Sequence, residues 1–244
     1  VFKRIREHDG AVHSFLTLTE EAALEQAKEA DRKISHKETL RPLEGIPVAV
    51  KDVICTAEVR TTAASRILEN YVPPYDATVV KKLKEAGAII VGKVNCDEFA
   101  HGASTENSAY GPSHNPWDLS RSPGGSSGGS SAALAAGFCL AALGTDTGGS
   151  TRQPAGWCNL YGLRPTYGRI SRYGLIAMTS SMDTPGIFTK TAEDMALLLE
   201  ILAGHDNRDA TSLPAKVDDY QAKLSASLQG LKIGLPKEFF AEGE

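Results

Sequence analysis

The sequence lacks the features that mark several large classes of protein. No apolar stretch approaches the ~20 residues needed to span a bilayer, and no signal peptide is recognisable. Lysine and arginine total 26 against 30 for aspartate and glutamate, and the net charge of −4 gives no basic field that would attract nucleic acid. We therefore expect a cytoplasmic protein that contacts no membrane and does not bind nucleic acid by itself.

Cysteine and histidine are also sparse, and neither forms a metal-binding pattern. The sequence has no C-x-x-C pair, and its four cysteines are too few for a disulfide scaffold in 244 residues. The six histidines show no H-x-x-x-H spacing. All the cysteines lie in or beside apolar runs, where this residue usually packs as a small hydrophobe: Cys55, Cys96, Cys139 and Cys158. We expect no metal site and no catalytic thiol in this chain.

What the sequence does contain is typical of a globular α/β protein. Hydrophobic residues make up 41% of the chain and charged residues 23%, near the averages for globular proteins. Residues 46–50 predict a buried strand, residues 77–85 a helix that ends at Gly87, and residues 88–91 a second buried strand. This succession favours an α/β fold over a helix bundle or a sandwich. We expect a single domain over residues 1–244.

Other elements are predicted from caps and composition. Thr19 is the expected N-cap of a helix to about Ile34, and Thr191 that of a helix ending at Gly204. Residues 102–123 show no periodicity, so they should form a long ordered surface or active-site segment. The remaining predictions are a short helix at 1–8 and strands at 140–143 and 231–235.

Glycines and serines alone occupy residues 124–131. Such runs are usually flexible linkers, but this one continues without a break into the alanine-rich residues 132–136. A second Gly-Gly-Ser, at 148–150, follows a strand-like segment. Because a linker has no reason to recur beside buried elements, a linker is disfavoured. A phosphate-binding loop is excluded, because no lysine follows the last glycine of the run.

One serine of this run also fits the nucleophile elbow of α/β-hydrolases. Residues 124–128 satisfy G-x-S-x-G around Ser126, and Asp183 and His205 follow in the required order. The elbow must come directly after a strand, however, and residues 115–123 do not have the composition of a strand. The elbow interpretation is therefore rejected, because no strand is expected directly before residue 124.

The second Gly-Gly-Ser suits acyl transfer, which needs a nucleophile, a base and amide donors aimed at the developing oxyanion. Glycines let backbone N–H groups approach a ligand closely. Lys51 is a candidate base because it directly follows the apolar run 46–50. Lys51 can act as a base only if its pKa falls from about 10.4 to about 7–8. That shift corresponds to roughly 4 kcal/mol of stabilisation of the neutral amine relative to the charged one, which apolar surroundings can provide. The alternative is a structural salt bridge to a carboxylate.

Together these motifs resemble the amidase signature family. The resemblance rests on Lys51, on residues 124–130 and on residues 146–155, which have the family's order and spacing. The family's catalytic triad is Ser–cis-Ser–Lys. The resemblance therefore implies that Ser150 is the acyl-enzyme nucleophile, Ser126 the bridging serine that relays a proton, and Lys51 the base. It also implies an α/β fold with a mixed central sheet covered by helices.

The resemblance implies supporting roles as well. The oxyanion hole corresponds to the backbone of Thr147, Gly148, Gly149 and Ser150. Residues that support the serines or hold the glycine turn correspond to Ser127, Asp146 and Arg152. A loop that lines the substrate pocket in relatives usually reads Met-Gly-Ser-Ser, and here it reads His101, Gly102, Ala103 and Ser104. That difference bears on which amide is accepted.

Further segments are similar to one branch of the family, the A subunits of the aspartyl/glutamyl-tRNA amidotransferases: residues 105–111, 115–118, 165–169, 171–176 and 203–206. This similarity implies a glutaminase within a heterotrimer that also has B and C subunits. Ammonia from glutamine would pass to the B subunit, which uses ATP and Mg²⁺ to amidate misacylated Glu-tRNA(Gln) or Asp-tRNA(Asn). The tRNA would be bound through the complex, and this chain would hold no cofactor.

Members of that branch are about twice as long as this chain of 244 residues. We therefore expect the chain to be truncated at its C-terminal side, with the residues that anchor glutamine in the other half. Two alternative functions stay open. A stand-alone amidase for small amides would share the triad without needing partners. An inactive scaffold protein would have lost a triad residue, and none of the three is lost.

Overall fold

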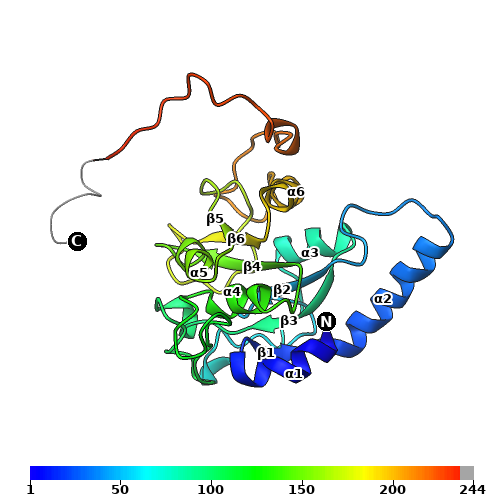
Figure 1. The fold of residues 1–244 in the computed structure, drawn as a ribbon, viewed down its shortest axis with the longest axis vertical. Helices are drawn as coiled ribbons and strands as arrows, with labels where there is room; N and C mark the ends of the chain where they lie inside the picture. Colours follow the sequence, from blue (N-terminus) through cyan, green and yellow to red (C-terminus); the bar gives the residue numbers. More distant parts are fainter. Residues whose placement is uncertain (237–244) are drawn as a thin grey trace.

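Six strands form one mixed sheet at the centre of the structure, a computed structural model that describes residues 1–236 (Figure 1). The strands are β1 (Phe15–Leu18), β2 (Pro47–Lys51), β3 (Ile89–Val94), β4 (Ala141–Asp146), β5 (Tyr161–Leu163) and β6 (Thr184–Thr189). Their order across the sheet is β1-β3-β2-β4-β6-β5. β2 runs parallel to β3 and β4, whereas the β1–β3, β4–β6 and β5–β6 pairs are antiparallel. The predicted α/β fold with a mixed sheet is confirmed.

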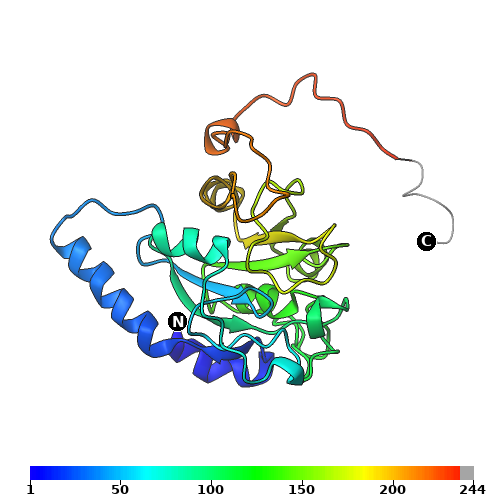
Figure 2. The same cartoon turned by 180° about the vertical axis from the view of Figure 1, so that it is seen from behind.

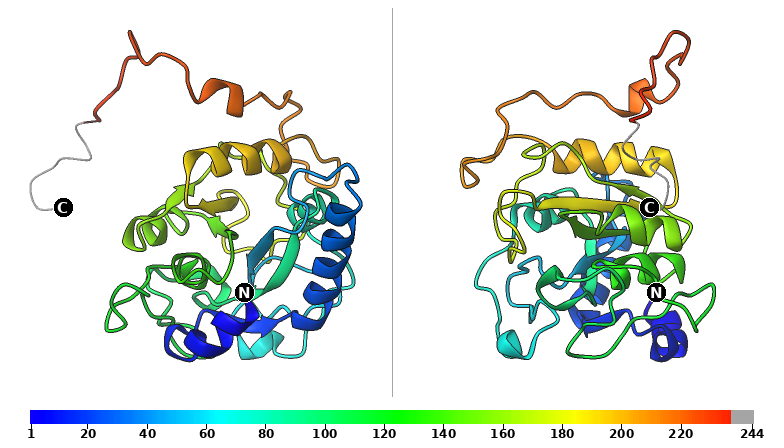
Figure 3. Two further views of the ribbon diagram at one scale, coloured as in Figure 1. Left: turned by 45° about the vertical axis from the view of Figure 1, so that its right-hand side comes forward. Right: turned by 90° about the vertical axis from the view of Figure 1, so that its left-hand side faces the viewer.

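Helices cover both faces of the sheet (Figure 3). They are α1 (Phe2–Val12), α2 (Glu20–Ser35), α3 (Thr78–Glu85), α4 (Gly128–Ala135), α5 (Arg152–Trp157) and α6 (Ala192–Leu202), with 3₁₀ turns at Arg66–Leu68, Glu98–Ala100 and Gln221–Lys223. Because side chains alternate along a strand, Val48 and Val50 of β2 join one apolar cluster with α3 and α6, whereas Ala49 joins the other with α1 and α4. In α2, which runs along the outside of the molecule (Figure 2), the buried residues are Ala23 and Ala30.

The parallel pairing of β2 with β4 places the candidate catalytic residues together. Parallel strands end at the same edge of a sheet, and the crevice beyond those ends is where open α/β sheets usually bind ligands. Lys51 is the last residue of β2, and Asp146 is the last residue of β4. The turn that carries Ser150 follows β4 directly, and α4 begins just after Ser126 and Ser127. The four segments therefore meet at one sheet edge.

Most predicted elements are confirmed, although the role of one cap is different. Thr191 accepts the N–H of Asp194 at 3.1 Å, as an N-cap should. Thr19 has the N-cap position of α2, but its hydroxyl instead donates to the carbonyl of Ile90 at 2.6 Å. That bond ties the start of α2 to β3 and leaves the helix without a side-chain cap.

The strand predicted at residues 231–235 is wrong. These residues have no regular secondary structure, and Leu231, Ile233 and Leu235 are 65%, 79% and 75% exposed. The segment after α6 leaves the sheet and runs outward (Figure 1). A run of apolar residues becomes a strand only if a neighbouring strand accepts its hydrogen bonds, and none in the described part of the chain pairs with it.

Candidate active site

Lys51 is completely buried at the end of β2. Its Nζ donates hydrogen bonds to Ser126 Oγ at 2.7 Å and to Thr145 Oγ1 at 2.8 Å. Burial penalises the charged amine more than the surrounding carboxylates favour it, and this lowers the pKa of Lys51 to about 8. An amine with such a pKa is neutral in part of the molecules near pH 7 and can then accept a proton.

A second buried lysine, Lys93 of β3, has the structural role that was the alternative for Lys51. Its Nζ lies 3.6 Å from Asp52 Oδ1 and donates to the carbonyl of Ile54 and to Thr61 Oγ1, both at 2.7 Å. Pairing with a carboxylate is the usual way to bury a cation. Within residues 1–236, Lys51 forms no such ion pair and contacts hydroxyl groups instead, which suits a base rather than a structural cation.

Ser126 follows a cis peptide bond to Gly125. Its Oγ accepts the hydrogen bond from Lys51, and its carbonyl accepts the N–H of Asp97 at 3.2 Å. Only glycine fits before Ser126, because a Cβ at Gly125 would overlap the Asp97 carboxylate and the backbone of Ser104. The structure thus brings Lys51 and Ser126 into contact, as the family resemblance implied.

Ser127 connects three segments of the site. Its Oγ donates to the carbonyl of Thr145 at 3.1 Å and accepts the N–H of the same residue at 3.3 Å. Its own N–H donates to the carbonyl of Ser150 at 3.2 Å. Ser127 precedes α4 without capping it, because its hydroxyl is engaged with β4. These bonds fix the Ser126 segment against β4 and against the turn that carries Ser150.

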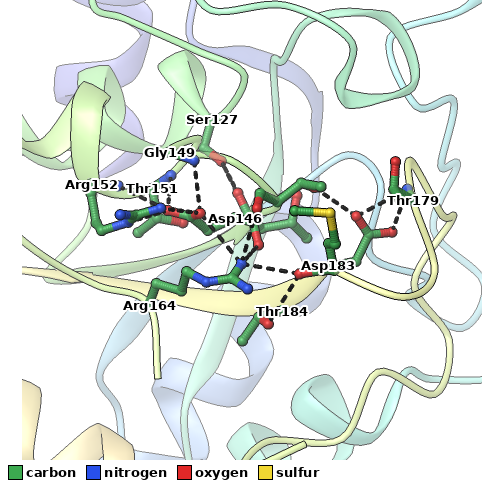
Figure 4. Close-up of polar contacts among 12 residues, drawn as sticks. Ser127, Asp146, Gly149, Thr151, Arg152, Arg164, Thr179, Asp183 and Thr184 are labelled. Carbon is green, nitrogen blue, oxygen red and sulfur yellow. Dashed lines mark hydrogen bonds and ion pairs between the residues drawn. The ribbon is translucent and has the colours of Figure 1, made fainter. Parts of the chain in front are cut away.

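The turn after β4 is built on the carboxylate of Asp146 (Figure 4). This carboxylate accepts the N–H of Gly149 at 2.9 Å and of Thr151 at 3.1 Å, and it pairs with the Arg152 guanidinium at 3.0 and 3.1 Å. Burial favours the neutral acid, but the hydrogen bonds from Arg152 and Thr151 outweigh it and hold the pKa of Asp146 below its usual range. Gly149 has a φ of 140°, which L side chains rarely adopt.

Ser150 lies at the end of this turn and is 9% exposed, next to the exposed Gly148. The N–H of Gly149 points to Asp146, so in this conformation it is not free to donate to an oxyanion. Within the described residues, the N–H groups of Gly148 and Ser150 have no protein acceptor, and Ser150 Oγ forms no hydrogen bond with Ser126. The N–H of Thr147 likewise has no acceptor in the described chain, so three of the four expected amides of the turn are free beside a serine hydroxyl.

Asp183, a candidate only in the rejected elbow, supports the same turn (Figure 4). Its carboxylate accepts the hydroxyl of Thr147 at 2.6 Å and the N–H groups of Met178 and Thr179 at 2.9 and 3.1 Å. His205 has a different partner, because its Nδ1 lies 3.2 Å from the carbonyl of Ser212. No strand precedes residue 124 directly, so the rejection of the elbow is confirmed.

Arg164 is a second supporting residue that no motif revealed. Its Nη1 donates to the carbonyl of Asp146 and, at 3.0 Å, to the carbonyl of Met182 (Figure 4). The guanidinium thereby ties the end of β4 to the segment before β6. Arg164 follows β5 and Asp183 precedes β6, and the antiparallel pairing of β6 with both β5 and β4 brings them to the glycine turn. No motif or periodicity in the sequence indicated that either residue supports this turn.

The loop assigned to the substrate pocket by resemblance lies beside the Ser126 segment. His101, Gly102 and Ala103 are exposed, and Ser104 is half-buried. Ser122 Oγ donates to the carbonyl of Ser104 at 2.7 Å, and Gln153 Nε2 donates to the carbonyl of Ala103 at 2.9 Å. The loop is thus held by both residues, and its outer part faces solvent.

The cysteines have the character expected of small hydrophobes. All four are buried and free, and burial raises the pKa of Cys96 and Cys139 to about 12 and that of Cys158 to about 11. Such thiols are poor nucleophiles, because the thiolate is the reactive form. Among residues 1–236, no cluster of His, Cys, Asp and Glu is arranged to hold a metal ion, and no helix has the length and apolar character needed to cross a membrane.

Comparison with known proteins identifies the family. The sequence matches the Amidase family over residues 1–243. This chain belongs to the amidase family. Among its relatives, the A subunit of glutamyl-tRNA(Gln) amidotransferase from Carboxydothermus hydrogenoformans is 57% identical over 242 residues, covering 99% of this chain and 50% of that protein. The protein of the same name from Syntrophus aciditrophicus is 58% identical over 243 residues, covering 100% and 50%.

Solved structures of amidase-family proteins share the fold. The A subunit of glutamyl-tRNA(Gln) amidotransferase from Thermotoga maritima is 50% identical, with a TM-score of 0.77 over 88% of this chain and 45% of that chain. Peptide amidase from Stenotrophomonas maltophilia is 36% identical, with a TM-score of 0.83 over 91% and 47%. This chain spans about half the length of the curated relatives it matches.

Proposed function

We propose that this chain carries the glutaminase site of a tRNA-dependent amidotransferase. The observation that carries the proposal is the buried Lys51, bonded to Ser126 and free of any ion pair in the described chain, at the sheet edge where the Ser150 turn lies. The high identity to two proteins that are named as A subunits of such enzymes favours glutamine as the amide.

In the proposed reaction, Ser150 Oγ attacks the carboxamide carbon of glutamine while its proton passes to Ser126, whose own proton passes to neutral Lys51. The amides of Gly148 and Ser150 stabilise the negative charge that develops on the carbonyl oxygen. Collapse of the tetrahedral intermediate breaks the C–N bond, and the proton returns along the same path to the leaving nitrogen. Ammonia departs, leaving a glutamyl ester on Ser150, which water hydrolyses to glutamate.

The amidation of tRNA belongs, in this proposal, to partner subunits. A B subunit would bind ATP and Mg²⁺, activate the misacylated Glu-tRNA(Gln) or Asp-tRNA(Asn), and receive the ammonia, and a small C subunit would join the two in a heterotrimer. Four unpaired cysteines favour a reducing compartment, the cytoplasm. Affinity purification of the complete protein from its cells should recover both partners, together with ammonia release from glutamine.

A stand-alone amidase is the second candidate, and the similarity to a peptide amidase fold is the observation in its favour. Such an enzyme would purify without partners and would hydrolyse small or peptide amides in preference to glutamine. Recovery of an active, unpartnered protein with that preference would overturn the glutaminase proposal, although the roles of Lys51, Ser126 and Ser150 would be unchanged.

The lowered pKa of Lys51 predicts the dependence of the rate on pH. Below about pH 8 the base is mostly protonated, so kcat/KM for amide hydrolysis should rise about tenfold per pH unit and level off above pH 8. Between about pH 8 and pH 10.5, the ordinary pKa of a lysine, Lys51 is neutral in the folded state and protonated in the unfolded state. Its contribution to the free energy of unfolding therefore rises with pH in this range. The pH profile of kcat/KM and the free energy of unfolding in urea at different pH values test whether both quantities rise as predicted. A profile that is flat between about pH 6 and 9 would contradict a lysine base.

The bond between Thr147 and Asp183 predicts a measurable support of the turn. Thr147→Val keeps the shape of the side chain and removes the hydroxyl that Asp183 accepts. We expect kcat to fall about fivefold to tenfold, since the turn that aims the amides is held less firmly. Thr184→Val is the matched control, because the hydroxyl of Thr184 bonds only weakly, at 3.5 Å, to the carbonyl of Met182. Equal kcat values for the two variants would show that the turn does not depend on Asp183.

A further inference from the structure

Three segments of the candidate site converge on one side chain outside the triad, that of Gln153. It belongs to α5, which begins two residues after Ser150, and it is half-buried. Its Nε2 donates to the carbonyl of Ala103 at 2.9 Å, and its Oε1 accepts the N–H of Gly125 at 2.9 Å. A single amide group thus links the helix after the nucleophile, the pocket loop and the peptide before Ser126.

Both halves of this amide are used, and that explains why glutamine suits the position. The Ala103 carbonyl needs a donor and the Gly125 N–H needs an acceptor, so the bridging group must provide both at once. Glutamate could keep only the acceptor, and methionine neither. The fit is also close, because a Cβ at Gly124 would overlap Gln153 Oε1 and the backbone of Pro154.

The loop depends on this bridge at Ala103, because no other hydrogen bond of the described residues holds Ala103. Residues 101–103 are exposed, so without fixed bonds their backbone would gain conformational freedom. Ser122 fixes Ser104. His101 is held at the other end of the loop, because its N–H donates to the carbonyl of Glu98 at 3.0 Å and its own carbonyl accepts from Asn107. Among the hydrogen bonds of the described chain, the one from Gln153 is the link from Ala103 to the segment that carries Ser150.

We infer that Gln153 is a positioning residue of the hydrolytic site. It fixes the pocket loop 101–104 and Gly125, the residue before Ser126, in position relative to Ser150. The inference rests on the proposed function, since it takes amide hydrolysis to occur at these residues. It assigns two separable effects to one side chain. The Nε2 bond orders the loop that the family resemblance assigns to the substrate pocket, whereas the Oε1 bond holds the segment that relays the proton in the proposed reaction.

Two substitutions in the complete protein, assayed with its partners, separate these effects. Gln153→Glu keeps an acceptor for Gly125 and loses the donor to Ala103, so KM for glutamine should rise about tenfold with kcat nearly unchanged. Gln153→Met loses both bonds, so kcat should also fall about tenfold. Gln26→Met, at an exposed position of α2, is the control and should match wild type.

A merely structural role would lower the melting temperature of both variants and leave the KM and kcat of the folded fraction at wild-type values, and that result would overturn the inference. So would a Gln153→Glu variant with unchanged KM. The rate at which a fluorophosphonate probe labels Ser150 gives a readout that does not require glutamine. It should fall in Gln153→Met and be retained in Gln153→Glu. If wild type hydrolyses a short primary amide but not glutamine, the proposed function fails, and the same two variants assayed with that amide still test Gln153.

Discussion

Replacing Lys51 with arginine is expected to abolish amide hydrolysis while the fold is retained. The guanidinium keeps a positive charge but stays protonated at any pH at which the protein is folded, so it cannot accept the proton relayed through Ser126. General-base catalysis typically contributes about 10²–10⁴-fold, and we expect kcat/KM to fall by about 10³-fold or more. Steady-state ammonia release and far-UV circular dichroism measure the two parts of this prediction.

The side chain of Lys51 is completely buried, so the bulk of arginine could itself disturb its surroundings. Lys51→Met is therefore the companion variant, because it has nearly the length of lysine, lacks the amine and adds no volume. It should be equally inactive. Lys81→Arg provides the matched control, since Lys81 is an exposed residue of α3. Turnover of glutamine by either Lys51 variant at a substantial fraction of the wild-type rate would make Lys51 a structural residue like Lys93.

Replacing Ser150 with alanine should abolish the use of glutamine as nitrogen donor and leave the use of free ammonium intact. The substitution removes the nucleophile and a single oxygen atom, so the turn held by Asp146 and the assembly with partners should survive. In the complete complex, ammonium bypasses the acyl-enzyme step. Formation of Gln-tRNA(Gln) from Glu-tRNA(Gln) is then measured with each donor in turn.

The control for this experiment is Ser35→Ala, an exposed serine at the end of α2, which should use both donors as wild type does. Two results would contradict the division of labour. An assembled Ser150→Ala complex that also fails with ammonium would give Ser150 a role beyond glutamine hydrolysis. A wild-type protein with no tRNA-linked activity from either donor would be a stand-alone amidase.

Elements whose signal is local could be predicted from the order of residues alone. The apolar runs at 46–50 and 88–91 form β2 and β3, and the capped pattern from Thr191 forms α6, because short-range periodicity and caps decide these structures. The position of Lys51 directly after an apolar run predicts its burial, and burial is the main cause of its lowered pKa. The motifs around Ser126 and Ser150 likewise indicate the family without any knowledge of the fold.

Features that depend on partners distant in the sequence became visible in the folded chain. β1, β5 and β6 were not predicted, since strands at the antiparallel parts of a sheet are defined by the neighbour they pair with. Residues 231–235 have a strand-like composition but no neighbour within the described residues, and they stay irregular. Asp183 reaches the turn only through strand pairing, and the bonding partners of Gln153 lie 50 and 28 positions away from it in the sequence. A hydrogen bond between residues 36 positions apart, such as that of Thr147 with Asp183, leaves no periodic trace in a single sequence.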